Sequence, residues 1–203
     1  MKRFPRLLFC FALITALVQV AHAQVTIYTA ILNGANEAPA NASPATGLAI
    51  VTLNFGAPHI MRVQVTFAGL VANVTAAHIH AATASPGTGT AGVATTTPTF
   101  TDFPTAVTGG TYVHDFNMTF SSSYNASFIT NNGATTASAE TALFTAIANG
   151  RAYLNIQSAT FPGGEIRGFL TPIPEPSTYA GLAGLAALVF AIRRRVTKLA
   201  AAT

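Results

Sequence analysis

Apolar and polar side chains alternate with a period of two along residues 49–55, 61–67 and 112–120. In the clearest stretch the apolar positions are Met61, Val63, Val65 and Phe67. One apolar face and one polar face are typical of a half-buried antiparallel strand. Shorter apolar runs predict further strands at residues 25–32, 76–80, 152–157 and 165–170. Turn signals separate these runs, so the pattern predicts an all-β fold, an antiparallel β-sandwich or barrel.

One segment has helical periodicity instead. Ala142, Leu143, Ala146 and Ile147 form a stripe within residues 138–148, with Ser138 placed to cap the start of a helix. We expect one short helix across an end of the sandwich. Two long loops are expected at residues 39–46 and 81–104, and the second is either mobile or packed on the surface.

The amino-terminal end predicts export. Lys2, Arg3 and Arg6 precede an apolar stretch at residues 7–20, and an A-x-A cleavage signal follows at residues 21–23. These are the parts of a secretory signal peptide, here residues 1–23, so the mature chain would begin at Gln24. The one cysteine, Cys10, lies in this signal, which leaves the mature protein without a disulfide or thiolate ligand.

The carboxyl-terminal end predicts membrane attachment. A proline-rich spacer at residues 172–178 precedes an uncharged apolar run, and three arginines follow at residues 193–195. An entirely apolar helix belongs in lipid or a core, and arginines after it stay on the cytoplasmic side. We expect a transmembrane helix at residues 178–192 that anchors the precursor in the inner membrane.

Charge is concentrated at the two ends. The whole chain has a formal charge of +4, whereas residues 24–171 hold three arginines against five carboxylates, a net of −2. No basic patch with interleaved aromatic residues occurs, which argues against nucleic-acid binding. Residues 24–171 have the length of one domain with a full core.

The sequence His78-Ile79-His80 offers two imidazoles on one face of a predicted strand. They could share one copper or zinc ion, with a third ligand supplied by His114 or His59 from elsewhere. Alternatively, both histidines hydrogen-bond to loop carbonyls and hold the strand to residues 81–86. His114 alternates with Tyr112 and is then a neutral residue of the core.

No catalytic constellation is evident. Residues 87–92 match G-x-G-x-x-G, but no helix-forming sequence follows them, so a dinucleotide site is rejected. Glu165 and Arg167 share one strand face, where an exposed pair would have a structural role. Glu37 either points into the domain or fastens its own loop.

Three blocks together resemble the CHRD domain over about residues 25–170. They are residues 32–39 with 45–47, residues 77–80, and residues 150–157 with 162–168. The resemblance implies an extracellular β-sandwich of the immunoglobulin or Cu/Zn superoxide dismutase type without an established general activity. It makes Glu37, Glu165 and Arg167 structural motif positions. Gln157 stands where family members often have histidine, so a three-histidine site would be incomplete.

The tail, residues 172–203, resembles the PEP-CTERM sorting signal of Gram-negative bacteria. Its parts are Pro174, Glu175 and Pro176, the apolar run, and Arg193, Arg194 and Arg195. The resemblance implies recognition by an exosortase, cleavage near the motif, and release or attachment at the cell surface, in a biofilm or polysaccharide matrix. The alternative is a plain membrane anchor.

Three functions follow as hypotheses. The leading one is a secreted, non-enzymatic domain of the cell surface or matrix, without a cofactor, whose partners are polysaccharide or surface proteins. The second is a copper- or zinc-binding domain of superoxide dismutase type that uses His78 and His80. The third is a periplasmic hydrolase, for which no catalytic residues can be named.

Overall fold

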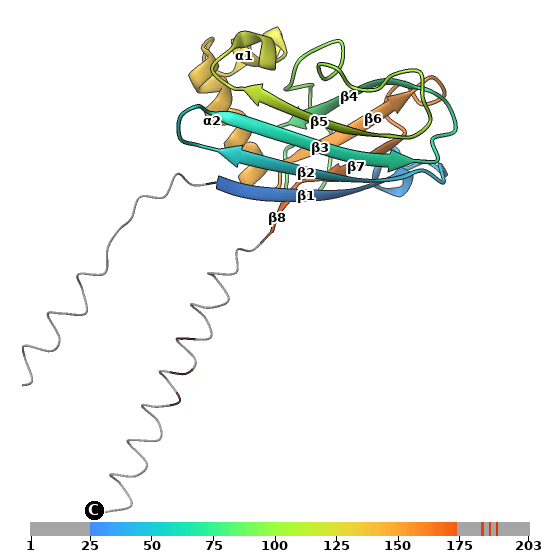
Figure 1. The fold of residues 1–203 in the computed structure, drawn as a ribbon, viewed down its shortest axis with the longest axis horizontal. Coiled ribbons are helices and arrows are strands. Elements are labelled where there is room, and N and C mark those ends of the chain that lie inside the picture. Colours follow the sequence, from blue (N-terminus) through green and yellow to red (C-terminus); the bar gives the residue numbers. More distant parts are fainter. Residues whose placement is uncertain (1–24, 174–183, 185–186, 188–189, 191–203) are drawn as a thin grey trace, which may run out of the picture.

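The alternating segments form a single antiparallel sheet that curls on itself. The computed structural model describes residues 25–173 together with 184, 187 and 190. The strands are β1 (Val25–Asn33), β2 (Thr46–Asn54), β3 (Ile60–Ala68), β4 (Val74–Ala81), β5 (Gly110–Asn117), β6 (Ala152–Ser158), β7 (Ile166–Phe169) and β8 (Thr171–Pro172). Their order is β4-β6-β7-β1-β2-β3-β5, and β8 pairs with β1. Curling places β4, β6 and β7 behind the other strands (Figure 1).

The predicted alternation is confirmed by burial. The apolar positions of β3, from Met61 to Phe67, are at most 2% exposed, because they face the interior of the curled sheet. The strand predicted at residues 112–120 is shorter than expected and ends at Asn117. The Asn117 side chain accepts a hydrogen bond from the Thr119 backbone, which turns the chain and leaves Phe120 60% exposed.

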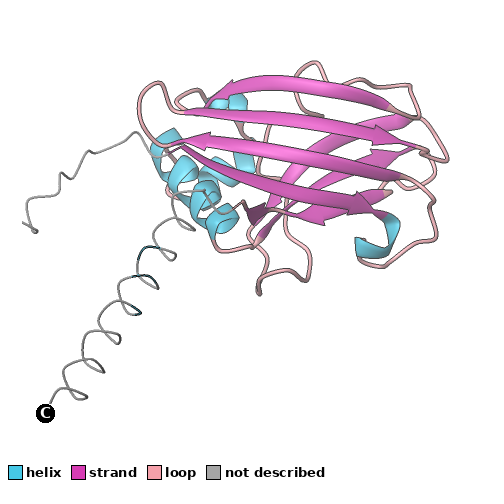
Figure 2. Ribbon diagram, turned by 60° about the horizontal axis from the view of Figure 1, so that its bottom comes forward, coloured by secondary structure: helices cyan, strands magenta, loops and turns pink. Residues whose placement is uncertain are grey.

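Two helices, not one, lie at one end of the sheet (Figure 2). They are α1 (Ala126–Asn131) and α2 (Thr136–Ala148). The N-cap of α2 is Thr135, so the predicted cap at Ser138 is wrong. Ser138 instead occupies the third helical position and completes a capping box with Thr135. At the opposite end, the short 3-10 helix η1 (Gly34–Asn36) follows β1 (Figure 1).

The long loop after β4 is packed on the sheet. It hydrogen-bonds to the free edge of β4, from Ala94 N to Ile79 O and from Phe100 N to Ala77 O. Phe100 and Phe103 are buried and anchor it in the core. The loop thus covers an edge that would otherwise invite pairing with another chain.

Several predictions lie outside the described residues, namely the signal peptide, the sorting-motif residues Pro174 to Pro176 and Arg193 to Arg195, and most of the helix at 178–192, of which residues 184, 187 and 190 are described and helical. Within the described part of the chain, no helix has the length and apolar character needed to cross a membrane.

Candidate functional site

His78 and His80 lie on the face of β4 that points away from the core, beneath the long loop. Nε2 of His78 is 2.9 Å from the carbonyl oxygen of Pro98, and Nδ1 of His80 is 2.9 Å from that of Ala91. Burial lowers the pKa of His78 to about 4 and also lowers the pKa of His80. Both imidazoles are therefore neutral and hold the loop, although through residues 91 and 98 rather than 81–86.

His114 does not complete a metal site. It lies on β5, at the opposite edge of the sheet from β4, with its ring against Phe116 and its Nδ1 3.8 Å from Asp102. His59 instead contacts Glu140 at 2.9 Å. Among residues 25–173 no group of three His, Cys, Asp or Glu side chains is placed to bind a metal. This arrangement gives no support to His114 as a third ligand, since sequence alternation does not show which edge of the sheet a strand occupies.

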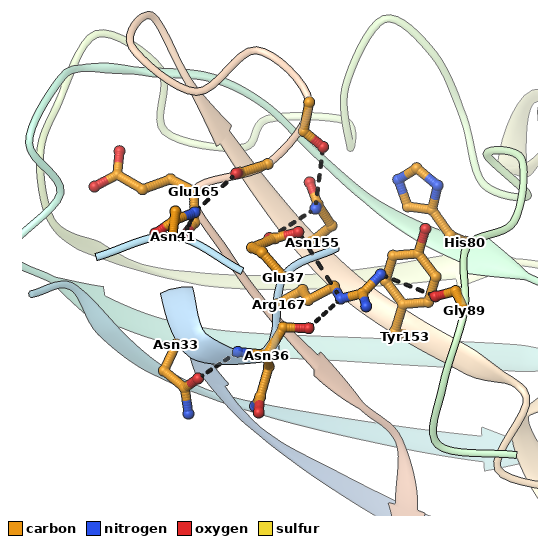
Figure 3. A network of polar contacts seen from close by, with 12 residues as sticks. Asn33, Asn36, Glu37, Asn41, His80, Gly89, Tyr153, Asn155, Glu165 and Arg167 are labelled. Carbon is orange, nitrogen blue, oxygen red and sulfur yellow. Dashed lines mark hydrogen bonds and ion pairs between the residues drawn. The ribbon is translucent and has the colours of Figure 1, made fainter. Parts of the chain in front are cut away.

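A buried polar network lies at the end of the sheet opposite the helices, and Glu37 is its centre (Figure 3). Glu37 Oε1 accepts a hydrogen bond from Asn155 Nδ2 at 3.0 Å, and Oε2 is 3.8 Å from Arg167 Nε. Arg167 also donates to the carbonyl oxygens of Asn36 and Gly89. The strand register brings these side chains together, because Arg167 on β7 lies between Asn155 on β6 and the end of β1, which Glu37 follows along the chain.

The charges of this network are almost enclosed. Glu37 is 8% exposed and Arg167 is 4% exposed. Burial raises the pKa of Glu37 to about 7, although the nearby Arg167 guanidinium lowers it. The guanidinium carbon lies 4.7 Å from the centre of the Tyr153 ring, which stacks in turn on His80 at 4.8 Å. A cation–aromatic stack therefore links β7, β6 and β4.

Gly164 is required by the same network. Its φ is +142°, and a Cβ at this position would come within 2.6 Å of Glu37 Oε1. A side chain here would displace the Glu37 carboxylate from Asn155. The turn at residues 162–164 therefore needs glycine at its last position for close approach as well as for its backbone angle.

Glu165 does not form the exposed pair with Arg167 that the sequence suggested. Glu165 is fully buried and points away from Arg167 (Figure 3). Its Oε1 accepts hydrogen bonds from Ser43 Oγ at 2.6 Å and from Val71 N at 2.7 Å. The two side chains therefore fasten different loops. They do not share a strand face, because β7 begins at Ile166 and Glu165 precedes it.

Two cavities open on either side of Glu37. The larger, about 520 Å³, has Arg167, Phe169 and the turn at residues 87–89 among its walls. The smaller, about 400 Å³, lies between residues 37–41 and 160–164. Gly87 and Gly89 have positive φ and form a turn at the larger cavity. The prediction that no helix follows this turn is confirmed, because the next element along the chain is the strand β5.

Sequence reasoning identified Glu37 and Arg167 as motif positions but did not bring them together, and it missed Asn155, Asn36 and Gly89. The block at residues 150–157 contained a signal for Asn155, a polar residue in an otherwise apolar strand. The roles of Asn36 and Gly89 depend on their backbone carbonyls, which no sequence pattern marks.

Comparison with protein-family models finds two matches. Residues 28–170 match the CHRD domain, and residues 172–195 match the PEP-CTERM protein-sorting motif. The second match implies recognition by an exosortase and export from the cytoplasm of a Gram-negative bacterium. No curated protein and no solved structure matches the chain.

Proposed function

The chain belongs to the CHRD domain family, and on this premise we propose that it supplies a non-enzymatic module to the cell surface or extracellular matrix. In this proposal the curled sheet is a sandwich related to the immunoglobulin and superoxide dismutase folds. Its partners there are extracellular polysaccharide or other surface proteins. Residues 1–23 direct export, residues 24–171 are the functional domain, and residues 172–203 are the sorting segment.

The observation that carries the proposal is where the described strands begin and end. The last described strand, β8, pairs with β1 so that Pro172 lies opposite Tyr28, and the backbone N–H of Ile173 donates a hydrogen bond to the carbonyl oxygen of Ile27. The sorting motif follows directly. At the other end, β1 begins at Val25, just after the predicted signal cleavage. Removal of both ends would therefore leave every described strand in place.

The chemistry of the buried polar groups supports a non-enzymatic role. The side chains of His78, His80, Glu165 and Arg167 bond mainly to backbone groups of the protein's own loops. Such bonds hold the loops against the sheet, which is a structural role. Neither matched family is enzymatic.

Fractionation of the producing cell tests the proposal. A short epitope placed in the exposed β2–β3 turn at residues 56–58 would follow the domain, and intact mass would report which ends remain. We expect a product lacking both ends outside the inner membrane. A matched variant with Pro174, Glu175 and Pro176 all changed to alanine should stay in the membrane fraction. Full-length native protein in the cytoplasm would refute the proposal.

A further inference from the structure

The larger cavity beside Glu37 has the lining of a site for a polar, uncharged molecule. Its volume of about 520 Å³ lies in the range usual for small-molecule sites. Arg167 and Glu37 are the only ionisable groups among its lining residues, and their formal charges cancel. The other polar walls are Asn36, Thr88 and backbone of the glycine turn.

One nitrogen of the Arg167 guanidinium, Nη2, keeps both of its N–H donors free to bind a ligand. Nε and Nη1 donate to the carbonyl oxygens of Asn36 and Gly89, while Nη2 has no hydrogen-bond acceptor among the described residues. Glu37 Oε2 lies next to the same guanidinium. A hydroxyl group can accept from Nη2 and donate to the carboxylate at the same time, so neighbouring hydroxyls suit this pair.

An apolar strip continues from the cavity across three strands. Ile31 pairs directly with Leu48, and the register of β1 with β7 and β8 places Ile31 opposite Phe169. Ile31 is 68% exposed and Leu48 is 46% exposed. At a strand spacing of about 4.8 Å, the strip from Phe169 to Leu48 is roughly 10 Å long. This is about the length of two pyranose rings, whose apolar faces pack on such surfaces.

Other ligand classes fit less well. An anion would approach the Glu37 carboxylate, and two of the Arg167 donors that could hold it are already occupied. A peptide that adds a strand needs a free sheet edge, whereas β1 and β7 are paired on both sides.

We propose that this cavity and strip bind a neutral saccharide, one unit contacting Arg167 and Glu37 and the next lying on Ile31. The proposal rests on the proposed function, because an exported matrix domain would meet polysaccharide. It assigns that contact to one place on the domain and to one chemical class.

The test uses the processed protein purified from the producing cell. The probes are neutral and acidic oligosaccharides released by mild acid from the extracellular polysaccharide of that cell and separated by anion exchange. In amide NMR spectra, the neutral fraction should shift the signals of Gly87, Gly89 and Phe169. Ile31→Asp, at an exposed position, should weaken this binding about tenfold or more.

Val113→Asp is the matched control, because Val113 is 54% exposed on β5, away from the cavity. It should bind as the native protein does. Glu37→Gln should also weaken binding. If that variant fails to fold, the comparison of Ile31→Asp with Val113→Asp still tests the proposal, because both substitutions are at exposed positions. Equal binding by Ile31→Asp, no shift with the neutral fraction, or shifts with the acidic fraction alone would each overturn the proposal. Fractionation reports separately on export, so failure of the site and failure of the proposed function are distinguishable.

Discussion

Replacement of Arg167 by methionine should destabilise the domain strongly, because it leaves the Glu37 carboxylate buried without its cation. Methionine keeps much of the length of the side chain and loses the charge. It removes the hydrogen bonds to Asn36 and Gly89 and the guanidinium contact with Tyr153 at 4.7 Å. Breaking a buried pair in this way costs about 3–5 kcal/mol of unfolding free energy.

This loss should depend on pH. At pH 8 the Glu37 carboxyl, whose pKa is about 7, is ionised in the native protein. Without Arg167 its pKa rises further, so in the variant it must either carry an unpaired buried charge or take up a proton, and both cost free energy. At pH 5 the Glu37 carboxyl is protonated in both folded proteins. Only the lost hydrogen bonds and ring contact then remain, so the penalty should fall to roughly 1–3 kcal/mol.

Urea unfolding followed by circular dichroism at both pH values measures the two penalties. Arg62→Met is the matched control, because Arg62 pairs with Asp115 at 3.2 Å on the surface, with its side chain 46% exposed. Its penalty should be about 0–1 kcal/mol at either pH. If Arg167→Met costs no more than Arg62→Met, or costs the same at pH 5 and pH 8, the network around Glu37 does not stabilise the fold as described.

Three further predictions concern stability and are checked by the same unfolding measurement. Gly164→Ala should cost about 2–4 kcal/mol because its Cβ would meet the Glu37 carboxylate, whereas Gly163→Ala, with no atom within 4 Å, should change stability little; equal effects would contradict this. Between about pH 4.5 and 6.5 the folded state holds a proton on Glu37, which makes the protein more stable as the pH falls, while the unfolded state holds a proton on His78, which makes the protein less stable as the pH falls. Glu37→Gln removes the first effect, and its stability should therefore fall faster than that of the native protein as the pH drops through this range; parallel curves would refute the assignment. Thr135→Ala should cost about 1 kcal/mol through loss of the capping box of α2, and no change would show that the cap is dispensable.

The all-β class could be predicted because burial alternates along most strands. In β3 every second residue is buried, and the period is visible without any tertiary information. β4 and β6 are different, since nearly every residue in them is buried. One face of β4 packs in the core, while the long loop covers the other, so alternation alone could not locate His78 and His80.

The candidate site was harder to predict than the strands. Glu37 and Asn155 are 118 residues apart, and Glu165 and Ser43 are 122 apart. The sequence marks these residues only as parts of separate blocks. Their meeting depends on strand order, which places β7 between β6 and β1 although β1 is first along the chain. Spacing within a block could therefore suggest an exposed pair of Glu165 and Arg167, although each belongs to a different network.

The path of β1 separates the saccharide cavity from the two processed ends. The described chain begins and ends near the start of this strand, where the Ile173 N–H donates a hydrogen bond to the Ile27 carbonyl. Arg167, by contrast, lies beside Asn33 at the other end of the strand. Six residues of strand amount to about 20 Å. A domain still held by its sorting segment would therefore present the cavity away from the point of attachment. We expect the variant with residues 174–176 changed to alanine, solubilised from the membrane, to bind the neutral oligosaccharides as tightly as the released protein. Binding found only after release would mean that the tail covers the site.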